Sequence, residues 1–226
     1  MAAFAAVYAL LGFIPAFKIL GGTGFISASA FVSPVVGLLL GPVFGAASMT
    51  IGGVLGTMLN IGAAPLGFFS FIPGALCALS SGLIRKGRGW ISALMLGVLV
   101  VAFLVYPPNN VQPIFPYYVW LHLVALFILL SPIRRQAAEL GQRMKLDEAV
   151  TGIALIAFPS TMIEQMTGSL IWAFLLGPAV SSVWSEFGMP IMLAYPIERT
   201  IITVGASIIG AALLRSLRAA GVDVDK

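Results

Sequence analysis

Long apolar runs separated by short polar or glycine-rich stretches account for nearly the whole chain. Each run is about 15 to 25 residues long, the length that an α-helix needs to cross a bilayer. The runs cover residues 2–19, 26–40, 42–60, 66–84, 90–106, 117–132, 148–176 and 191–215. This pattern predicts an all-α fold, a polytopic membrane bundle of about eight transmembrane helices that forms one integral membrane domain over residues 1–226.

The composition agrees with a membrane protein and argues against several other classes. Hydrophobic residues make up 60% of the 226 residues, charged residues make up 9%, and the mean hydropathy is +1.06. No soluble globular domain has this balance. One cysteine, Cys77, rules out an internal disulfide, and one histidine, His122, has too few soft ligands nearby for a metal cluster. We therefore expect no metal, no cofactor and no nucleic-acid partner.

Lysine and arginine gather at alternate ends of the apolar runs. They form three clusters, which are Arg85, Lys86 and Arg88, then Arg134, Arg135, Arg143 and Lys145, then Arg215, Arg218 and Lys226. The intervening stretches, at about residues 20–25, 61–65, 107–116 and 177–190, contain no lysine or arginine. The positive-inside rule then predicts that all three clusters and both termini lie in the cytoplasm, in a multi-pass protein of the plasma membrane.

Two connecting segments have a distinct composition. Residues 133–146 are polar, with Glu139 and Arg143 four residues apart, so this segment is either a solvated cytoplasmic connector or a short interfacial helix. Residues 107–116 contain four prolines and two asparagines, which predicts a rigid, extended outer cap.

Polar residues on four apolar segments fall at one predicted depth. A rise of 1.5 Å per residue, counted from the cytoplasmic ends, brings Lys18, Asn60, Glu164 and Arg199 into the outer third of the bilayer. A charge inside a membrane is costly unless it is paired or faces water, so its default interpretation is a functional site. Glu164 and Arg199 are the natural ion pair, and a pair between Glu198 and Lys18 is the alternative.

We interpret this layer as a small-molecule pocket that opens outward beneath the glycine-rich loop at residues 21–24. The alternative is that the charges form salt bridges that only hold helices together. Aromatic residues at similar depth, which are Phe25, Phe68, Phe69, Trp172 and Tyr195, are suited to stack on a flat ligand. The candidate substrate-binding residues are Lys18, Thr23, Asn60, Glu164, Gln165, Tyr195, Glu198 and Arg199.

The first apolar run is unusually rich in alanine. Small residues let helix backbones approach closely in lipid, so this run either packs inside the bundle or docks on another membrane protein. The candidate docking residues are Ala2, Ala5, Ala6 and Ala9.

No recognisable catalytic motif occurs along the chain. A phosphate-binding glycine loop, an HExxH zinc motif and a Gly-x-Ser-x-Gly nucleophile are all missing from the sequence, as is an aspartate-rich prenyl-phosphate motif. The outer polar layer contains no nucleophile with a matching base. We therefore expect that the protein is not an enzyme.

Several motifs resemble the substrate-binding (S) subunits of energy-coupling factor transporters. They are the alanine-rich residues 2–11, the loop at residues 21–24, the run Gly41-Pro42-Val43-Phe44-Gly45-Ala46 with the following Gly52, Gly53 and Gly56, the step Phe71-Ile72-Pro73-Gly74, and Tyr195-Pro196 with Glu198-Arg199. The likeness covers most of residues 1–88 and 191–216. That family has six helices, so residues 90–106 and 117–132 would be an inserted hairpin.

The resemblance implies uptake of a vitamin or another micronutrient. It implies a ligand held near the outer face, beneath the loop between the first two helices. It also implies that the first helix docks on a transmembrane coupling subunit that works with two cytoplasmic ATPases. An alternative function is that of a structural or accessory subunit in a larger membrane complex.

Overall fold

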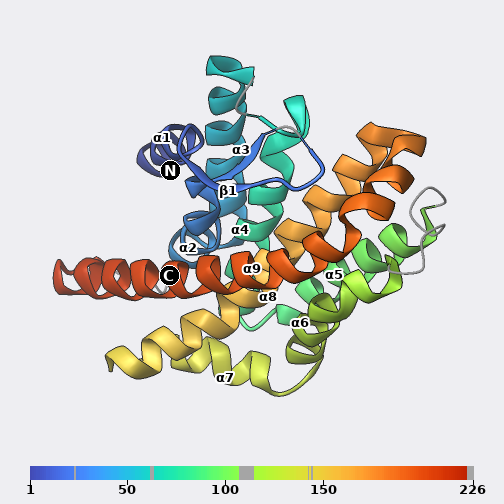
Figure 1. Cartoon of the computed structure of the whole chain (residues 1–226). Coiled ribbons are helices and arrows are strands. Elements are labelled where there is room, and N and C mark those ends of the chain that lie inside the picture. The colour runs from blue at the N-terminus through green and yellow to red at the C-terminus, as the bar shows by residue number, and fades with distance from the viewer. Residues whose placement is uncertain (23, 62–63, 107–114, 142, 144, 223–226) are drawn as a thin grey trace.

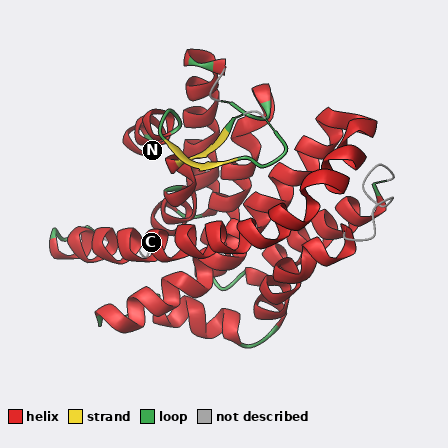
Figure 2. Ribbon diagram, in the orientation of Figure 1, coloured by secondary structure: helices red, strands yellow, loops and turns green. Residues whose placement is uncertain are grey.

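The structure is a computed structural model, and it describes all residues except 23, 62–63, 107–114, 142, 144 and 223–226. Helices dominate it, and one short two-stranded sheet interrupts them (Figures 1 and 2). The α-helices are α1 (Ala2–Leu11), α2 (Ser33–Leu40), α3 (Pro42–Leu59), α4 (Phe71–Arg85), α5 (Gly89–Val105), α6 (Trp120–Leu130), α7 (Ile133–Leu140), α8 (Leu146–Leu176) and α9 (Val180–Ala219). Strands β1 (Pro15–Lys18) and β2 (Phe25–Ser27) pair antiparallel, and short 3-10 turns cover Ala28–Phe31, Gly67–Ser70, Phe115–Val119 and Gly177–Ala179.

The all-α class predicted from the apolar runs is confirmed. Three helical stretches are long and apolar enough to cross a membrane: Pro42–Leu59, Gly67–Arg85 and Leu146–Ala219, the last of which comprises α8 and α9. A fourth span results if Tyr117–Leu130 and Ile133–Leu140, which meet at a bend of 77°, are counted as one. Shorter apolar helices cover Ala2–Leu11, Ala28–Leu40 and Gly89–Val105, so the count of eight spans stays a prediction.

The expected helix at residues 2–19 is too long. In the structure α1 ends at Leu11, and the chain then enters the β1–β2 hairpin. Pro15 has no backbone N–H to donate to a helix, and the positive φ angles of Gly21 (71°) and Gly24 (110°) let the hairpin turn. Lys18 therefore lies on a strand and not on a helix.

The expected outer loop at residues 177–190 is also wrong over most of its length. Gly177, with φ 56°, closes a tight turn that ends at Ala179, and α9 runs on from Val180 through Pro190 and Pro196. In contrast, residues 133–140 of the polar connector are helical, as one of the two alternatives required, and α7 buries Ala137 and Ala138. The outer cap expected at residues 107–116 lies largely outside the described residues.

Helices α8 and α9 run side by side across the middle of the molecule, with α1 to α4 on one side and α5 to α7 on the other (Figure 1). Glycines bring several helix pairs into backbone contact. A Cβ atom added at Gly37 of α2 would meet the carbonyl oxygen of Ala78 in α4, and one added at Gly152 of α8 would meet the backbone at Gly141. This close packing is what small residues achieve in membrane helices, where little hydrophobic force joins one helix to another.

Candidate functional site

A cavity of about 240 Å³ lies between the N-terminal helices and the α8–α9 pair. The β1–β2 hairpin and the ends of α3 and α4 form one wall, and α8 and α9 form the other. Its size is slightly below the range of about 300 to 1,000 Å³ that is typical of small-molecule sites. The cavity therefore suits a small ligand and is too small for a whole lipid.

Most of the predicted site residues line this cavity. The structure brings together seven of the eight, which are Lys18, Asn60, Glu164, Gln165, Tyr195, Glu198 and Arg199. Thr23, the eighth, is outside the described residues. Lys18 comes from β1, Asn60 follows α3, and the other five come from α8 and α9. Their participation in ligand binding stays a prediction, but their convergence on one cavity is a property of the fold.

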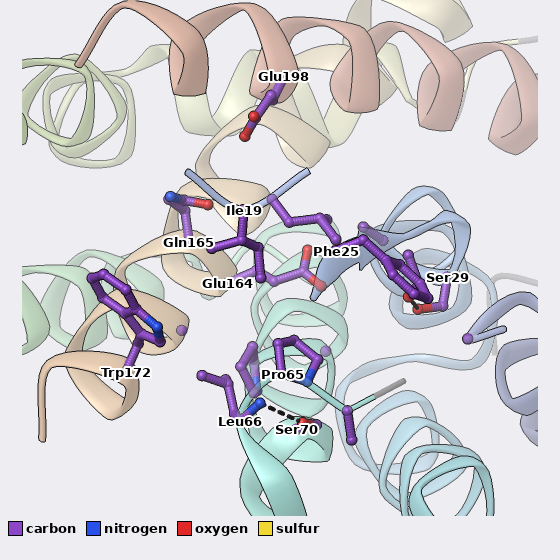
Figure 3. A pocket seen from close by; sticks show the side chains of 18 of the residues that line it. Ile19, Phe25, Ser29, Pro65, Leu66, Ser70, Glu164, Gln165, Trp172 and Glu198 are labelled. Carbon is purple, nitrogen blue, oxygen red and sulfur yellow. Dashed lines mark hydrogen bonds between the residues drawn. The ribbon is translucent and has the colours of Figure 1, made fainter. Parts of the chain in front are cut away.

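The close view in Figure 3 shows how the walls face each other. Glu198 points from α9 toward the cavity, Gln165 and Trp172 project from α8, and Pro65 and Leu66 lie on the opposite side. The backbone N–H of Leu66 donates to Ser70 Oγ at 3.0 Å, which fixes the chain just before α4. The aromatic side chains of Phe25 and Trp172 line the cavity, whereas those of Phe68 and Phe69 are exposed and do not.

Glu164 is the most buried carboxylate of the cavity wall. Its side chain is 9% exposed, and Ser33 Oγ of α2 donates to its Oε1 at 3.3 Å. The other oxygen, Oε2, is buried and makes no hydrogen bond with the part of the chain that the structure describes. A buried carboxylate that uses only part of its hydrogen-bonding capacity is costly to the fold, which favours a role in contacting something else.

Arg199 gives the same wall a positive charge. It is 2% exposed, and its Nε makes no hydrogen bond with any described residue. The expected ion pair between Glu164 and Arg199 is wrong, and so is the expected pair between Glu198 and Lys18. Among the described residues, none of these four takes part in an ion pair within 4.0 Å. The α8 helix turns Glu164 toward Ser33 instead, so the two charges reach the cavity unpaired.

Aromatic residues lie beside Arg199 in the cavity wall, because Tyr195 is four residues before it on the same face of α9. Tyr195 Oη donates to the carbonyl oxygen of Tyr118 at 2.7 Å, and the two rings are 4.8 Å apart. Gln165 Nε2 donates to Tyr118 Oη at 2.8 Å, so Tyr118 ties α8 to α9 at the cavity. Tyr118 and Trp184 line the cavity but were missed by the sequence analysis. The sequence marks these two residues only weakly as cavity residues, because aromatic residues near the ends of apolar runs are common in membrane proteins.

The docking face expected on α1 is only partly available. Ala5 and Ala9 are buried inside the chain, where α1 packs on α3, and a Cβ atom added at Gly52 would meet the backbone of Ala5. These two residues therefore pack the bundle in this structure, and docking on a partner stays a prediction. Ala2 and Ala6, on the other side of α1, are exposed.

No group of three or more His, Cys, Asp or Glu side chains that could hold a metal ion occurs among the described residues. The cavity instead combines an apolar lining with charges of both signs and with amide and hydroxyl groups. Apolar pockets with a few polar and charged groups are typical of small-molecule sites.

Comparison with known proteins adds one distant relative. It is an uncharacterized protein of Methanocaldococcus jannaschii that is 28% identical over 194 residues. The alignment covers 85% of this chain and 62% of the relative, so the chain spans about three fifths of that protein's length. No family model and no solved structure matches the chain.

Proposed function

We propose that the protein is the membrane-embedded substrate-binding subunit of a small-molecule importer and that its ligand occupies the cavity between the β1–β2 hairpin and α8–α9. The observation that carries this proposal is the pair of buried charges, Glu164 and Arg199, which line one cavity and make no ion pair with each other. Unpaired buried charge destabilises a fold, and a ligand of complementary charge offsets that cost.

The resemblance to energy-coupling factor S subunits supplies the rest of the proposal. Under this proposal the substrate is a vitamin or another micronutrient, and the partners are a coupling subunit and cytoplasmic ATPases. The chain then has eight spans, and α5 and α6 form the inserted hairpin. Ala2 and Ala6 are the part of the alanine-rich face that remains exposed for docking.

The distribution of charge along α3 and α4 supports the proposed orientation. Asn60, just after α3, lines the cavity, and Gly41, just before it, lies at the opposite end beside Lys86. Eighteen residues of helix separate these ends by about 27 Å, close to the thickness of the hydrocarbon core. The cluster Arg85, Lys86 and Arg88 thus lies near the end of α3 that is opposite to Asn60, and the positive-inside rule favours a cytoplasmic position for that end.

Ligand capture is the direct test. The protein is purified in mild detergent and examined by native mass spectrometry for a bound small molecule. Individual vitamins are then titrated into the purified protein. Trp172 and Trp184 both line the cavity, so their fluorescence reports on its occupation. We expect a saturable fluorescence change. If no compound co-purifies and none changes the fluorescence, the accessory-subunit function is the better explanation.

The topology is tested separately by cysteine labelling. The native Cys77 is fully buried and gives little background. We expect a membrane-impermeant thiol reagent applied from outside to label Asn110→Cys and to spare Arg143→Cys. Labelling of the second variant and not the first would overturn the proposed orientation.

A further inference from the structure

A second hollow, of about 860 Å³, lies at the end of α3 and α4 that is remote from the cavity. Three separate segments enclose it: the α2–α3 junction at residues 38–43, the α4–α5 turn at residues 82–88, and α7 at residues 135–139. We call this hollow the basic groove.

Positive charge dominates the basic groove. Its lining contains four cationic side chains, Arg85, Lys86, Arg88 and Arg135, and one acidic side chain, Glu139. These cations belong to two of the three basic clusters of the sequence, which the α6–α7 bend brings to one place. The positive-inside rule explains why cations lie on this side of the protein, but it does not require clusters 47 or more residues apart to share one hollow.

One wall of the groove is held in place by the fold. Arg85 is 8% exposed and donates a hydrogen bond from its guanidinium to the carbonyl oxygen of Leu38, near the end of α2. Lys86 passes over Gly41, where an added Cβ would lie 3.5 Å from Lys86 Cε. In contrast, the side chains of Lys86, Arg88 and Arg135 are exposed, so their charges are accessible to a ligand.

The remaining lining is apolar and continues onto the outer surface of the helices. Leu40, Pro42 and Val43 line the groove, and Val43 and the adjacent Phe44 are 69% and 60% exposed. A ligand that fills this hollow therefore meets cations at one end and hydrocarbon at the other. A free anion would use only the first of these surfaces.

We propose that the basic groove binds the phosphate headgroup of an anionic lipid, with the acyl chains lying along Val43 and Phe44. Arginine and lysine provide charge-assisted hydrogen bonds to phosphate oxygens, and basic pockets between membrane helices hold anionic headgroups in this way. The groove lies at the Pro42 end of α3, whose 18 residues rise about 27 Å, and the cavity is lined by the other half of that helix and by Asn60. If α3 spans the membrane, the groove lies at the headgroup layer opposite to Asn60. The proposal needs only that the helices span a membrane, so it stands even if the cavity binds nothing.

Lipid selectivity measured on the whole protein tests this proposal. The detergent-purified chain is mixed with equal amounts of phosphatidylglycerol and phosphatidylcholine, and retained lipid is counted by native mass spectrometry. We expect preferential retention of phosphatidylglycerol. The double variant Lys86→Gln with Arg88→Gln should lower that retention on the order of tenfold or more, because two nearby cations are lost.

Two further variants serve as matched controls. Arg215→Gln with Arg218→Gln removes two cations of the third cluster, outside the groove, and should leave the selectivity unchanged. Glu139→Gln removes the acid of the groove and should increase retention of phosphatidylglycerol. This gain can be measured even if the cation variant fails to fold.

The outcomes separate a lipid from other anions. If inorganic phosphate at millimolar concentration displaces the lipid completely and binds equally well without it, the ligand is a free phosphate and the lipid proposal fails. Equal retention of both lipids, or equal loss of selectivity in both double variants, also overturns it. If an acidic protein from a reconstituted complex occupies the groove and excludes lipid, the groove is a protein interface instead.

Discussion

Two regions of this molecule use glycine in opposite ways. At the α2–α4 and α7–α8 contacts, Gly37 and Gly152 face another backbone directly, and no room remains for a side chain. At the cavity, Gly168 of α8 has its nearest neighbour, Pro73 Cγ, 3.9 Å from where a Cβ would lie. The first arrangement joins helices that have little hydrophobic reason to associate in lipid, and the second keeps a space open between them. Residue type alone therefore does not separate packing from function.

The largest expected effect comes from adding a side chain where two helix backbones are already in contact. Gly37→Ala places a Cβ against the carbonyl oxygen of Ala78, which belongs to a helix backbone and cannot rotate away. We expect a loss of about 3 kcal/mol or more, which is a large part of a typical free energy of unfolding of about 5 to 15 kcal/mol. Thermal unfolding in detergent measures this loss. Gly97→Ala is the control, because nothing lies within 4 Å of its Cβ position, and an equal loss there would refute the explanation.

The same reasoning applies to α1, with a smaller effect. Ala5 is 3% exposed against α3, so Ala5→Leu should overpack that contact and lower the free energy of unfolding by about 1 to 3 kcal/mol. Ala6 lies on the exposed side of α1, so Ala6→Leu should leave the unfolding temperature unchanged.

The alanine pair also tests docking. If α1 contacts a coupling subunit, Ala6→Leu should abolish uptake in cells while ligand binding by the purified protein persists. A stable Ala5→Leu protein that has lost uptake alone would instead support a docking role for Ala5.

The helices and the cavity differ in how far the sequence predicts them. Apolar length places α4 and α5 within a few residues, because a membrane helix must satisfy its own backbone and so extends over most of the apolar run. The same rule fails at residues 12–19. The apolar side chains of Phe13, Ile14 and Phe17 continue the pattern of a membrane helix, but the chain forms a hairpin whose backbone hydrogen bonds are made by strand pairing. For Asn60, Glu164 and Arg199, which lie on or directly after helices, the helical rise predicted a common level, and all three line one cavity; Lys18 lines it from a strand, which the rise did not predict.

Side-chain partners could not be predicted in the same way. Counting the rise per residue predicts that Glu164 and Arg199 lie at nearly the same level, but it does not predict how each helix is rotated about its axis. The rotation of α8 toward α2 gives Glu164 a hydroxyl partner from Ser33, a residue that the apolar pattern does not mark. Tyr118 was missed for a similar reason. Its hydrogen bonds are made with Gln165 and Tyr195, which are 47 and 77 residues away from it in the sequence.

Arg199 distinguishes a binding site from a structural one. Because it makes no ion pair with any of the described residues, Arg199→Met should not lower the unfolding temperature, while ligand affinity falls by a factor on the order of 100. Binding is followed by tryptophan fluorescence. A structural pair would behave differently, with a loss of about 3 to 5 kcal/mol in the single variant and recovery in the double variant with Glu164→Gln.

The smallest expected effect is the most specific to the cavity. Gly168→Ala and Gly97→Ala are both helix-interior changes at half-buried positions, so each should gain about 0.5 to 1 kcal/mol of helix stability. They differ in one respect, because Gly168 lines the cavity and Gly97 does not. A single methyl group at residue 168 takes part of the space that the ligand uses without touching the opposite wall. We therefore expect a fewfold loss of ligand affinity for Gly168→Ala and none for Gly97→Ala, with matching rises in unfolding temperature. Equal affinities in the two variants would mean that the ligand does not reach α8 at this level, and the proposed site would then have to lie closer to the hairpin.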